Sequence, residues 1–490
     1  MMTPISHLLD NCRKYAGRTA LFIDGQTISY AELHDAVDAQ SKRLAAEVKP
    51  GERLALLCSN TLEFITLSLA AEAAGIIRVP LNIKCTAAEV AVMLADCAPA
   101  LVVYEEKTHG LLANAGSLRA VSAQSLCQGS GAGLATLPQA NDRCSITYTS
   151  GSTGKPKGVV LTHGNWHYVF ANMLIDRDIS ESDTLAFIGP LTHAGWSYLY
   201  AGLLRGARAA IFPAGDVEAM LAYAATEEVT ITTCVPTTLS RIVALMDETH
   251  PLRTSLKWIG VGGAPTSPAL LKRAMSAFGR RIVLNFGQTE AMMTCCFYDL
   301  RRESDRDDAA GFIGRSYVYT DMVIMSPEGQ PLPQGEIGEI CVRGPHTMLE
   351  YWGQPQLTAD AQRDGYVLTG DLGAEAEPGL FRIVGRAKEV IITGGFNVYP
   401  IEVEAAVAAL DDIDEVSVIG LACEEWGEKI TCFFSTHDGS LRDVDGLRAV
   451  LKPILGIKTP KEFYQLPALP KAPTGKIDKK ALRKWMEEKQ

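Results

Sequence analysis

The sequence predicts an α/β fold with a large N-terminal domain of stacked α/β subdomains, mostly parallel sheets, and a small mobile α+β domain at the C-terminus. Short apolar runs alternate with segments of helical periodicity through the first part of the chain, which is typical of layered α/β proteins. A stretch rich in Ser, Gly, Ala and Gln, residues 122–143, reads as a connector between two such blocks. The pattern changes near residues 385–390, so we predict domains over 1–387 and 388–490.

The elements of the large domain follow from local patterns, beginning with a hairpin. Two short apolar runs, Ala20–Asp24 and Thr27–Tyr30, flank Gly25 and predict paired strands. Residues 31–48 then repeat apolar side chains at helical spacing. The alternation continues with a strand over Arg53–Cys58, a helix over 61–75 and a strand over Ile76–Pro80.

The small domain is predicted to open with a helix at Pro400, because proline suits the first helical position. Val403, Val407 and Leu410 then repeat at helical spacing. The elements predicted after it are strands over 415–421 and 429–435, a helix over 442–454 and an extended segment over Glu462–Leu466.

Composition excludes several classes of protein. The 490 residues include 47% hydrophobic side chains, which is ample for a core, and the net charge of −11 without a basic cluster argues against nucleic-acid binding. The most apolar stretch, Ile65–Pro80, is interrupted by Glu72 and Arg78 and is shorter than the ~20 residues of a membrane span. The 12 cysteines show no CxxC spacing, and no secretory signal is visible, so we expect a cytoplasmic protein with reduced thiols. The sequence does not decide the oligomeric state, which is either a monomer or a homodimer.

A ten-residue loop, Thr149–Gly158, carries the strongest local signal. It follows a short predicted strand, Ser145–Tyr148, and contains three glycines and four hydroxyl side chains. Such a loop offers many N–H and O–H donors with little side-chain bulk, which suits a polyphosphate. It is not a Walker loop, because Lys155 is followed by Pro156 where that pattern requires Ser or Thr.

This loop resembles the signature of the adenylate-forming superfamily, which includes acyl-CoA synthetases, luciferases and the adenylation domains of peptide synthetases. The resemblance covers nearly the whole chain, because the family's further motifs follow in order. They are Gly262-Gly-Ala-Pro265, Asn285-Phe-Gly-Gln-Thr-Glu290, Thr369-Gly-Asp371, Gly385-Arg386 and Pro473-Thr-Gly-Lys476.

The resemblance implies a reaction in two halves. A carboxylate attacks the α-phosphate of ATP to give an acyl-adenylate and pyrophosphate, and the thiol of coenzyme A then displaces AMP. The implied cofactors are ATP, Mg²⁺ and coenzyme A, or a carrier-protein phosphopantetheine in its place. The implied ATP-binding residues are Thr149, Ser150, Gly151, Ser152, Thr153, Gly154, Lys157, Gly263, Ala264, Pro265, Asn285, Phe286, Gly287, Gln288, Asp371 and Arg386.

The resemblance also implies the catalytic groups. Glu290 is the expected Mg²⁺ ligand, since hard cations prefer oxygen ligands, and Thr289 is the expected phosphate contact. Lys476 is expected to hold the carboxylate and α-phosphate during adenylation. Lys388 is expected to be the hinge about which the small domain rotates between the half-reactions. The residues expected to approach the pantetheine arm are Gly394, Gly395 and Phe396.

The carboxylate pocket is predicted from the family's segments. Position 194 is Ala, where relatives that activate amino acids place an Asp, so an amino-acid substrate is disfavoured. No arginine lies in these segments to hold a second carboxylate, which leaves an apolar medium-chain fatty acid or aromatic acid; the adaptable Met292 and Met293 tip the balance towards a fatty acid. The predicted pocket residues are His193, Ala194, Gly195, Trp196, Val235, Gly262, Ala291 and Met292, with His193 also counted as catalytic.

Two alternatives to a coenzyme A ligase stay open. The acyl group is delivered to an acyl carrier protein in one, and only the acceptor surface would differ. In the other, the chain is a non-catalytic nucleotide-binding regulator. The combination of Glu290, Asp371 and Lys476 argues against a regulator, which has no need of a mobile lysine.

Overall fold

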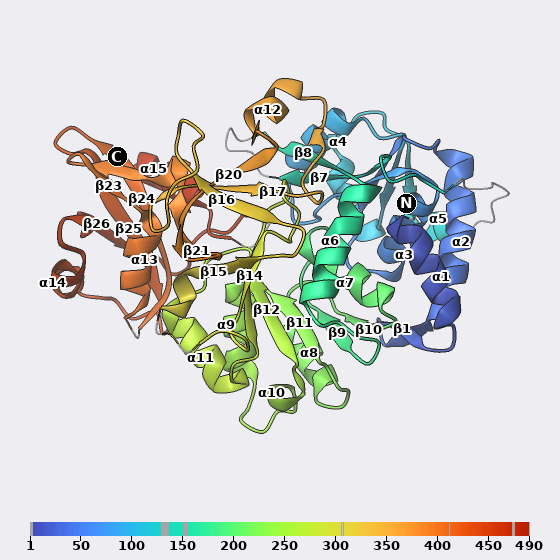
Figure 1. Ribbon diagram of the computed structural model, residues 1–490, viewed down its shortest axis with the longest axis horizontal. Helices are drawn as coiled ribbons and strands as arrows, with labels where there is room; N and C mark the ends of the chain where they lie inside the picture. The colour runs from blue at the N-terminus through green and yellow to red at the C-terminus, as the bar shows by residue number, and fades with distance from the viewer. Residues whose placement is uncertain are drawn as a thin grey trace.

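The computed structural model of the protein describes residues 3–128, 137–149, 155–304, 306, 308–410, 412–472 and 476–489. Within these ranges the strands form three sheets, and helices pack against them (Figure 1). The α/β class is therefore confirmed, with a large N-terminal part and a smaller C-terminal part. Across the same ranges, no helix has the length and apolar composition needed to cross a membrane.

The N-terminal elements match the predicted pattern. The strands β1 and β2 pair as an antiparallel hairpin, which confirms the prediction around Gly25. The side chain of Ser29 caps the following helix and Glu32 completes a capping box, so the helix begins where the hairpin ends. The elements are α1 (Pro4–Lys14), β1 (Thr19–Ile23), β2 (Gln26–Ser29), α2 (Tyr30–Glu47), β3 (Arg53–Leu57), α3 (Leu62–Ala73) and β4 (Ile77–Pro80).

A seven-stranded sheet has the order β18-β8-β7-β4-β3-β5-β6 among the described strands. Its β4, β3, β5, β6 side is parallel, whereas β8 runs antiparallel to β7 and to β18. The strand β7 ends at Thr149 and β8 begins at Lys157, so the two ends of the predicted phosphate loop lie side by side. The further elements are α4 (Ala87–Cys97), β5 (Leu101–Tyr104), β6 (Ala120–Ser122), α5 (Ala123–Cys127), β7 (Arg143–Thr149), β8 (Lys157–Thr162) and β18 (Glu350–Tyr351).

The largest sheet combines a parallel half with an antiparallel half. In the parallel half, β10, β9, β11, β12 and β13 are neighbours in that order. The elements of this half are α6 (His163–Asp176), β9 (Thr184–Phe187), α7 (Ala194–Leu204), β10 (Arg208–Ile211), α8 (Val217–Ala224), β11 (Ile231–Cys234), α9 (Pro236–Leu245), α10 (Leu252–Ser255), β12 (Trp258–Gly262), α11 (Pro268–Phe278) and β13 (Ile282–Phe286).

The antiparallel half continues the sheet beyond β13. Its strands are joined mostly by hairpins and irregular loops, and the one α-helix described between them, over Pro355–Asp360, is short, so helical periodicity gives little sign of this half. Its strands are β14 (Cys296–Asp299), β15 (Phe312–Ser316), β16 (Asp321–Met325), β17 (Gly338–Arg343), β19 (Gln362–Arg363), β20 (Tyr366–Glu377) and β21 (Leu380–Arg386), and α12 (Pro355–Asp360) lies between β18 and β19.

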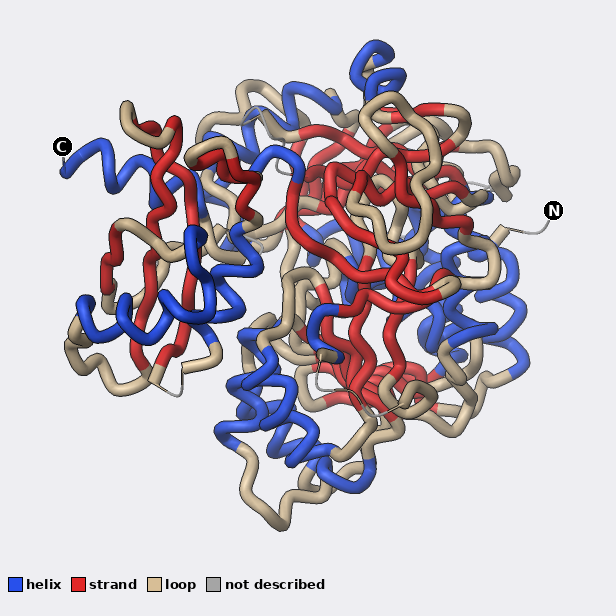
Figure 2. Tube along the Cα trace, turned by 60° about the vertical axis from the view of Figure 1, so that its left-hand side comes forward, coloured by secondary structure: helices blue, strands red, loops and turns tan. Residues whose placement is uncertain are grey.

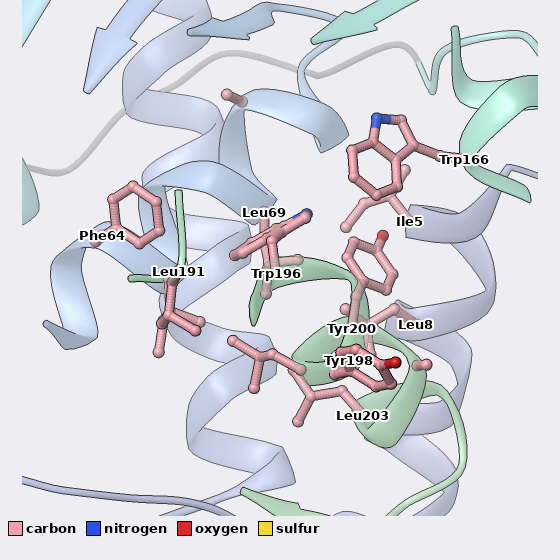
Figure 3. Packing of buried hydrophobic residues seen from close by; sticks show 14 of the residues in the cluster. Ile5, Leu8, Phe64, Leu69, Trp166, Leu191, Trp196, Tyr198, Tyr200 and Leu203 are labelled. Carbon is pink, nitrogen blue, oxygen red and sulfur yellow. The ribbon is translucent and has the colours of Figure 1, made fainter. Parts of the chain in front are cut away.

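One hydrophobic core joins the two larger sheets. Side chains from α1, α3, α6 and α7 interdigitate there, as Figure 3 shows for Leu8, Phe64 and Trp196. Trp196 meets Phe64 edge-on, with ring centroids 6.1 Å apart. Within the same core, the buried Arg78 donates from Nε to Glu72 Oε1 at 2.8 Å. Two sheets that share one core provide a rigid base for the loops at their edges.

The C-terminal unit is a separate sheet with its own core (Figure 2). Its strand order is β23-β22-β25-β24, with β26 beside β25, and the predicted helix at Pro400 is confirmed. A short 3₁₀ turn, Ala387–Glu389, connects it to β21. Its elements are β22 (Ile391–Thr393), β23 (Phe396–Val398), α13 (Pro400–Ala408), β24 (Ile413–Cys423), β25 (Gly427–Thr436), α14 (Val444–Leu455), β26 (Glu462–Gln465) and α15 (Lys479–Lys489).

Two buried histidines predict acid lability. His163 and His346 are 1% and 0% exposed, and no described residue hydrogen-bonds either ring. Burial lowers the pKa of each to about 4 from the ordinary 6.5. The unfolded chain therefore takes up protons below about pH 6.5 while the folded chain does not, so stability falls between pH 6.5 and 4. The loss is up to roughly 3 kcal/mol per histidine.

The measurement is the free energy of unfolding from pH 7.5 to 4.5. His346→Leu is expected to remove the part of the acid-induced loss of stability that His346 contributes. Above pH 6.5 neither histidine should make the free energy of unfolding depend on pH. An unchanged acid slope in the variant would show that another group causes the loss.

Candidate active site

Asp371 and Arg386 form the best-defined polar pair among the predicted site residues. They lie directly opposite each other on β20 and β21. Arg386 Nε lies 2.8 Å from Asp371 Oδ1, and Asp371 is only 3% exposed. Burial raises the pKa of Asp371, while the positive charges of Arg386 and Lys476 act in the opposite direction. A buried carboxylate beside a partly exposed guanidinium can bind vicinal hydroxyl groups and a phosphate at the same place.

Lys476 reaches this pair from the C-terminal unit. Burial of the ammonium group and the charge of Arg386 lower the pKa of Lys476, whereas Asp371 and Glu389 oppose the shift. The charge of Lys476 also lowers the pKa of His193, after the larger effect of burial. The charge of Lys476 therefore acts on two residues that are distant in sequence, Asp371 and His193, and the roles of all three in a nucleotide site stay predictions. Thr474 and the other residues before Lys476 in its motif lie outside the described residues.

The predicted adenine site lies at the carboxyl ends of β12 and β13. Gly262 pairs with Asn285 across these strands, and a Cβ at Gly262 would lie 2.9 Å from the carbonyl oxygen of Asn285. Gly263 has a φ of +81°, which favours glycine. These strand ends bring Gly263, and with it Ala264 and Pro265, beside the segment that begins at Asn285 and Phe286. The missing side chain of Gly262 therefore allows β12 and β13 to approach each other closely at this point.

Glu290 lies in a tight turn after β13. Gly287 permits this turn, because a Cβ there would lie 2.7 Å from the carbonyl oxygen of Met293. Within the turn, Gln288 pairs with Met292. Thr289 and Glu290 are both half-buried, and Glu290 Oε1 accepts a hydrogen bond of 2.8 Å from the hydroxyl of Tyr351. Its carboxylate suits a hard cation that is also held by phosphate oxygens.

Part of the predicted phosphate loop is described. Thr149 ends β7, and Lys157 begins β8 with its Nζ 5.0 Å from the ring centroid of Tyr351. The middle of the loop lies outside the described residues: Ser150, Gly151, Ser152, Thr153 and Gly154.

The residues predicted to line the acyl pocket have different environments. His193 precedes α7, with Nδ1 2.9 Å from the hydroxyl of Thr192, and Ala194 begins that helix. A Cβ at Gly195 would lie 3.0 Å from the carbonyl oxygen of Pro190, and Val235 lies 3.5 Å from the Cβ position of Gly263. Three side chains are buried in hydrophobic clusters: Trp196, Ala291 and Met292. The role of this set in a pocket stays a prediction.

The predicted pantetheine segment forms the turn between β22 and β23. Gly394 and Gly395 have φ values of +57° and +82°, and Phe396 is 55% exposed. Gly394 N–H donates to the carbonyl of Trp426 at 2.8 Å, which holds one side of the turn. The predicted hinge, Lys388, lies in the 3₁₀ turn between the two parts of the chain. Both roles stay predictions.

Two side chains that the sequence pattern did not single out contact predicted site residues. Arg177 is buried between the rings of Trp258 and Phe297, and it donates to Asn285 Oδ1 at 3.0 Å. Tyr351 binds Glu290 as described. Both residues are distant in sequence from the site residues that they contact, and no motif in their own segments indicates a role.

Two family models match the chain. The model of the AMP-binding enzyme matches residues 8–352. The model of the AMP-binding enzyme C-terminal domain matches residues 402–476. The second match includes Lys476, and the first includes Glu290 and the whole phosphate loop.

Characterised relatives match over nearly their whole length. A feruloyl-CoA synthase of Amycolatopsis sp is 34% identical over 473 residues, covering 95% of each chain. An indoleacetate–CoA ligase of Aromatoleum aromaticum is 30% identical over 496 residues, covering 96% of each. Among solved structures, o-succinylbenzoate CoA synthetase from Bacillus subtilis with its acyl-adenylate superposes with a TM-score of 0.89 at 25% identity, covering 97% of each chain.

Proposed function

The chain belongs to the AMP-binding enzyme family, and we propose that this AMP-forming acid–thiol ligase converts an apolar carboxylic acid into its coenzyme A thioester. The acid is first joined to AMP with loss of pyrophosphate, and the thiol then displaces AMP. The observation that supports the proposal most is that the charge of Lys476 acts on Asp371 beside Arg386, because a cation from the small unit would suit a nucleotide bound at this point of the large one.

The described residues suit an adenylation step. The carboxylate of Asp371 accepts hydrogen bonds from the ribose hydroxyls, and Arg386 adds a positive charge beside it. Lys476 holds the attacking carboxylate against the α-phosphate and offsets the charge that develops there. Mg²⁺, when bound with ATP, neutralises phosphate charge, and Glu290 with its carboxylate oxygens would hold it beside Thr289. His193, half-buried and with a lowered pKa, stays neutral near the carboxylate.

For the substrate, we propose an aromatic acid first and a medium-chain fatty acid second. The relatives named above act on ferulic acid and indoleacetic acid, which are aryl acids with one carboxylate. Ala194 leaves no carboxylate for a substrate ammonium, which supports an uncharged acyl group.

For the second half-reaction, we propose two domains, 1–387 and 388–490, that rotate about Lys388. Rotation would bring the turn with Gly394, Gly395 and Phe396 to the site now reached by Lys476. The exposed Phe396 and the compact glycines support this, because a pantetheine arm needs a narrow passage with an apolar wall.

Free coenzyme A is our proposed acceptor, and an acyl carrier protein is the second candidate. The coenzyme A ligases among the relatives favour the first. A cytoplasmic location and a monomer or homodimer complete the proposal. The position of Lys476, whose charge acts on Asp371, supports an enzyme over a non-catalytic regulator.

The deciding experiment is release of pyrophosphate with a panel of benzoates, cinnamates, indoleacetate and fatty acids of graded length, with and without coenzyme A. We expect release with an apolar acid and a coenzyme A thioester as product. If pyrophosphate is released but no coenzyme A thioester forms, and a phosphopantetheinylated carrier protein becomes acylated, then the acceptor is the carrier protein and not free coenzyme A. No release with any acid would overturn the proposal in favour of a regulator.

A further inference from the structure

Tyr351 connects two parts of the site that come from different sheets. It lies on β18, where it pairs with Val159 of β8, the strand that leaves the phosphate loop. Its hydroxyl donates to Oε1 of Glu290, at 2.8 Å, in the turn after β13 of the other sheet. A single buried side chain, 5% exposed, therefore spans from the phosphate-loop strand to the expected cation ligand.

The backbone around Tyr351 is fixed on both sides. Met348 N–H donates to the carbonyl of Glu290 at 2.8 Å, and Trp352 N–H donates to the carbonyl of Gly158 at 2.7 Å. The N–H of Tyr351 itself donates to Thr358 Oγ1 at 2.9 Å. With the chain held at these points, the ring has little freedom, so its hydroxyl defines where Glu290 Oε1 lies.

The chemistry of the contact gives the hydroxyl a fixed direction. A carboxylate oxygen can only accept a hydrogen bond, so the phenol hydroxyl of Tyr351 is the donor to Glu290 Oε1. Among the described hydrogen bonds, Glu290 uses only Oε1 for side-chain contacts within the protein. The carboxylate of Glu290 is therefore oriented by a hydroxyl donor, and lone pairs that this bond does not use are able to face a cation.

From this geometry we propose that Tyr351 is a positioning residue for the cation-binding carboxylate of Glu290. Tyr351 does not bind the cation itself but hydrogen-bonds to the residue expected to bind it. Removing a hydrogen bond of this kind typically weakens metal binding by about 10–100-fold. Lys157 Nζ also lies 5.0 Å from the centroid of the Tyr351 ring. Tyr351 therefore contacts both the strand that follows the predicted phosphate loop and the expected cation ligand. The inference rests on the proposed function for the identity of the cation and its nucleotide.

The test is Tyr351→Phe, which keeps the ring and removes only the hydroxyl. The primary measurement is the dissociation constant of Mn²⁺ in the presence of a non-hydrolysable ATP analogue, from the electron paramagnetic resonance signal of free Mn²⁺. We expect it to rise about tenfold. The Mg²⁺ concentration for half-maximal pyrophosphate release should rise in parallel, while kcat at saturating Mg²⁺ stays within about threefold and KM for the acid is unchanged.

Tyr366→Phe is a matched control. Tyr366 is 9% exposed, and its hydroxyl donates to Asp321 Oδ2 at 2.5 Å, so it makes the same kind of bond elsewhere in the molecule. It should leave the Mn²⁺ constant unchanged. In a Glu290→Gln background, Tyr351→Phe should add no further change, because its effect passes through that carboxylate.

The outcomes separate this inference from the proposed function. An unchanged Mn²⁺ constant in Tyr351→Phe, or an equal change in Tyr366→Phe, overturns it, whatever the enzyme ligates. An additional effect in the Glu290→Gln background also overturns it. If the wild-type chain released no pyrophosphate with any acid, the proposed function would fail while the Mn²⁺ measurement would still decide the role of Tyr351.

Discussion

Lys476→Ala is expected to lower the rate of acyl-adenylate formation by a factor of about 10²–10³ and to leave thioester formation from supplied acyl-adenylate nearly unchanged. The reason is the position of the ammonium group. It comes from the small unit, and its charge acts on Asp371 and on His193 at the edge of the large one. A cation placed there acts on charge that develops only while the α-phosphate is attacked.

The measurement separates the two half-reactions. Pyrophosphate exchange into ATP reports the first, and consumption of synthetic acyl-adenylate with coenzyme A reports the second. Lys484→Ala is a suitable control, because Lys484 lies in α15 of the same unit with its side chain 76% exposed. It should change neither rate. Equal losses of both half-reactions in Lys476→Ala would remove its assignment to adenylation.

Lys476→Arg gives a further check on this assignment. A guanidinium is a planar fork, whereas an ammonium is a compact charge, and the positive charge of Arg386 already acts on this position. We therefore expect little recovery of adenylation. Full recovery would mean that any positive charge in the region suffices.

The local pattern of the sequence predicts much of the fold and the motif residues of the site. The hairpin at Gly25, the helix opening at Pro400 and the strands predicted over 415–421 and 429–435 arise from short-range signals. The structure confirms them, with the last two lying within Ile413–Cys423 and Gly427–Thr436. The sequence pattern does not predict the antiparallel half of the large sheet. Its register is fixed by non-local pairs such as Asp371 with Arg386, which periodicity within one segment does not encode.

The same distinction applies to the site. Motifs mark Glu290, Asp371 and Lys476, so the sequence alone predicts them as site residues, and in the structure the charge of Lys476 acts on Asp371. Arg177 and Tyr351 have no such mark, since each acts by touching a motif residue that is more than 60 positions away. Residues that position others are visible only once the fold has brought distant elements together.

A buried ion pair in the core predicts the largest effect on stability. Glu72 and Arg78 have side chains 3% and 1% exposed, and their atoms Oε1 and Nε are 2.8 Å apart. The guanidinium carbon of Arg78 lies 4.6 Å from the ring centroid of Trp196 and 5.1 Å from that of Trp166. The charge of Arg78 is thus surrounded by aromatic rings and compensated by one carboxylate.

Glu72→Ala is expected to lower the free energy of unfolding by about 3–5 kcal/mol, because it leaves a guanidinium buried without its counter-charge. Denaturation by urea, followed through tryptophan fluorescence, measures the change, since Trp166 and Trp196 flank the site. Asp38→Ala is the control: its pair with Lys42 is a half-exposed i,i+4 contact, and about 0.5 kcal/mol or less should be lost.

The double variant Glu72→Leu with Arg78→Met decides what the pair contributes. Removing both charges relieves the desolvation cost of each, so stability should recover most of what Glu72→Ala loses. The side chains of Trp166 and Trp196 would then pack against an unbranched apolar chain of similar length. If the double variant is as unstable as Glu72→Ala, the loss comes from altered packing between α6 and α7, and the uncompensated charge is not its cause.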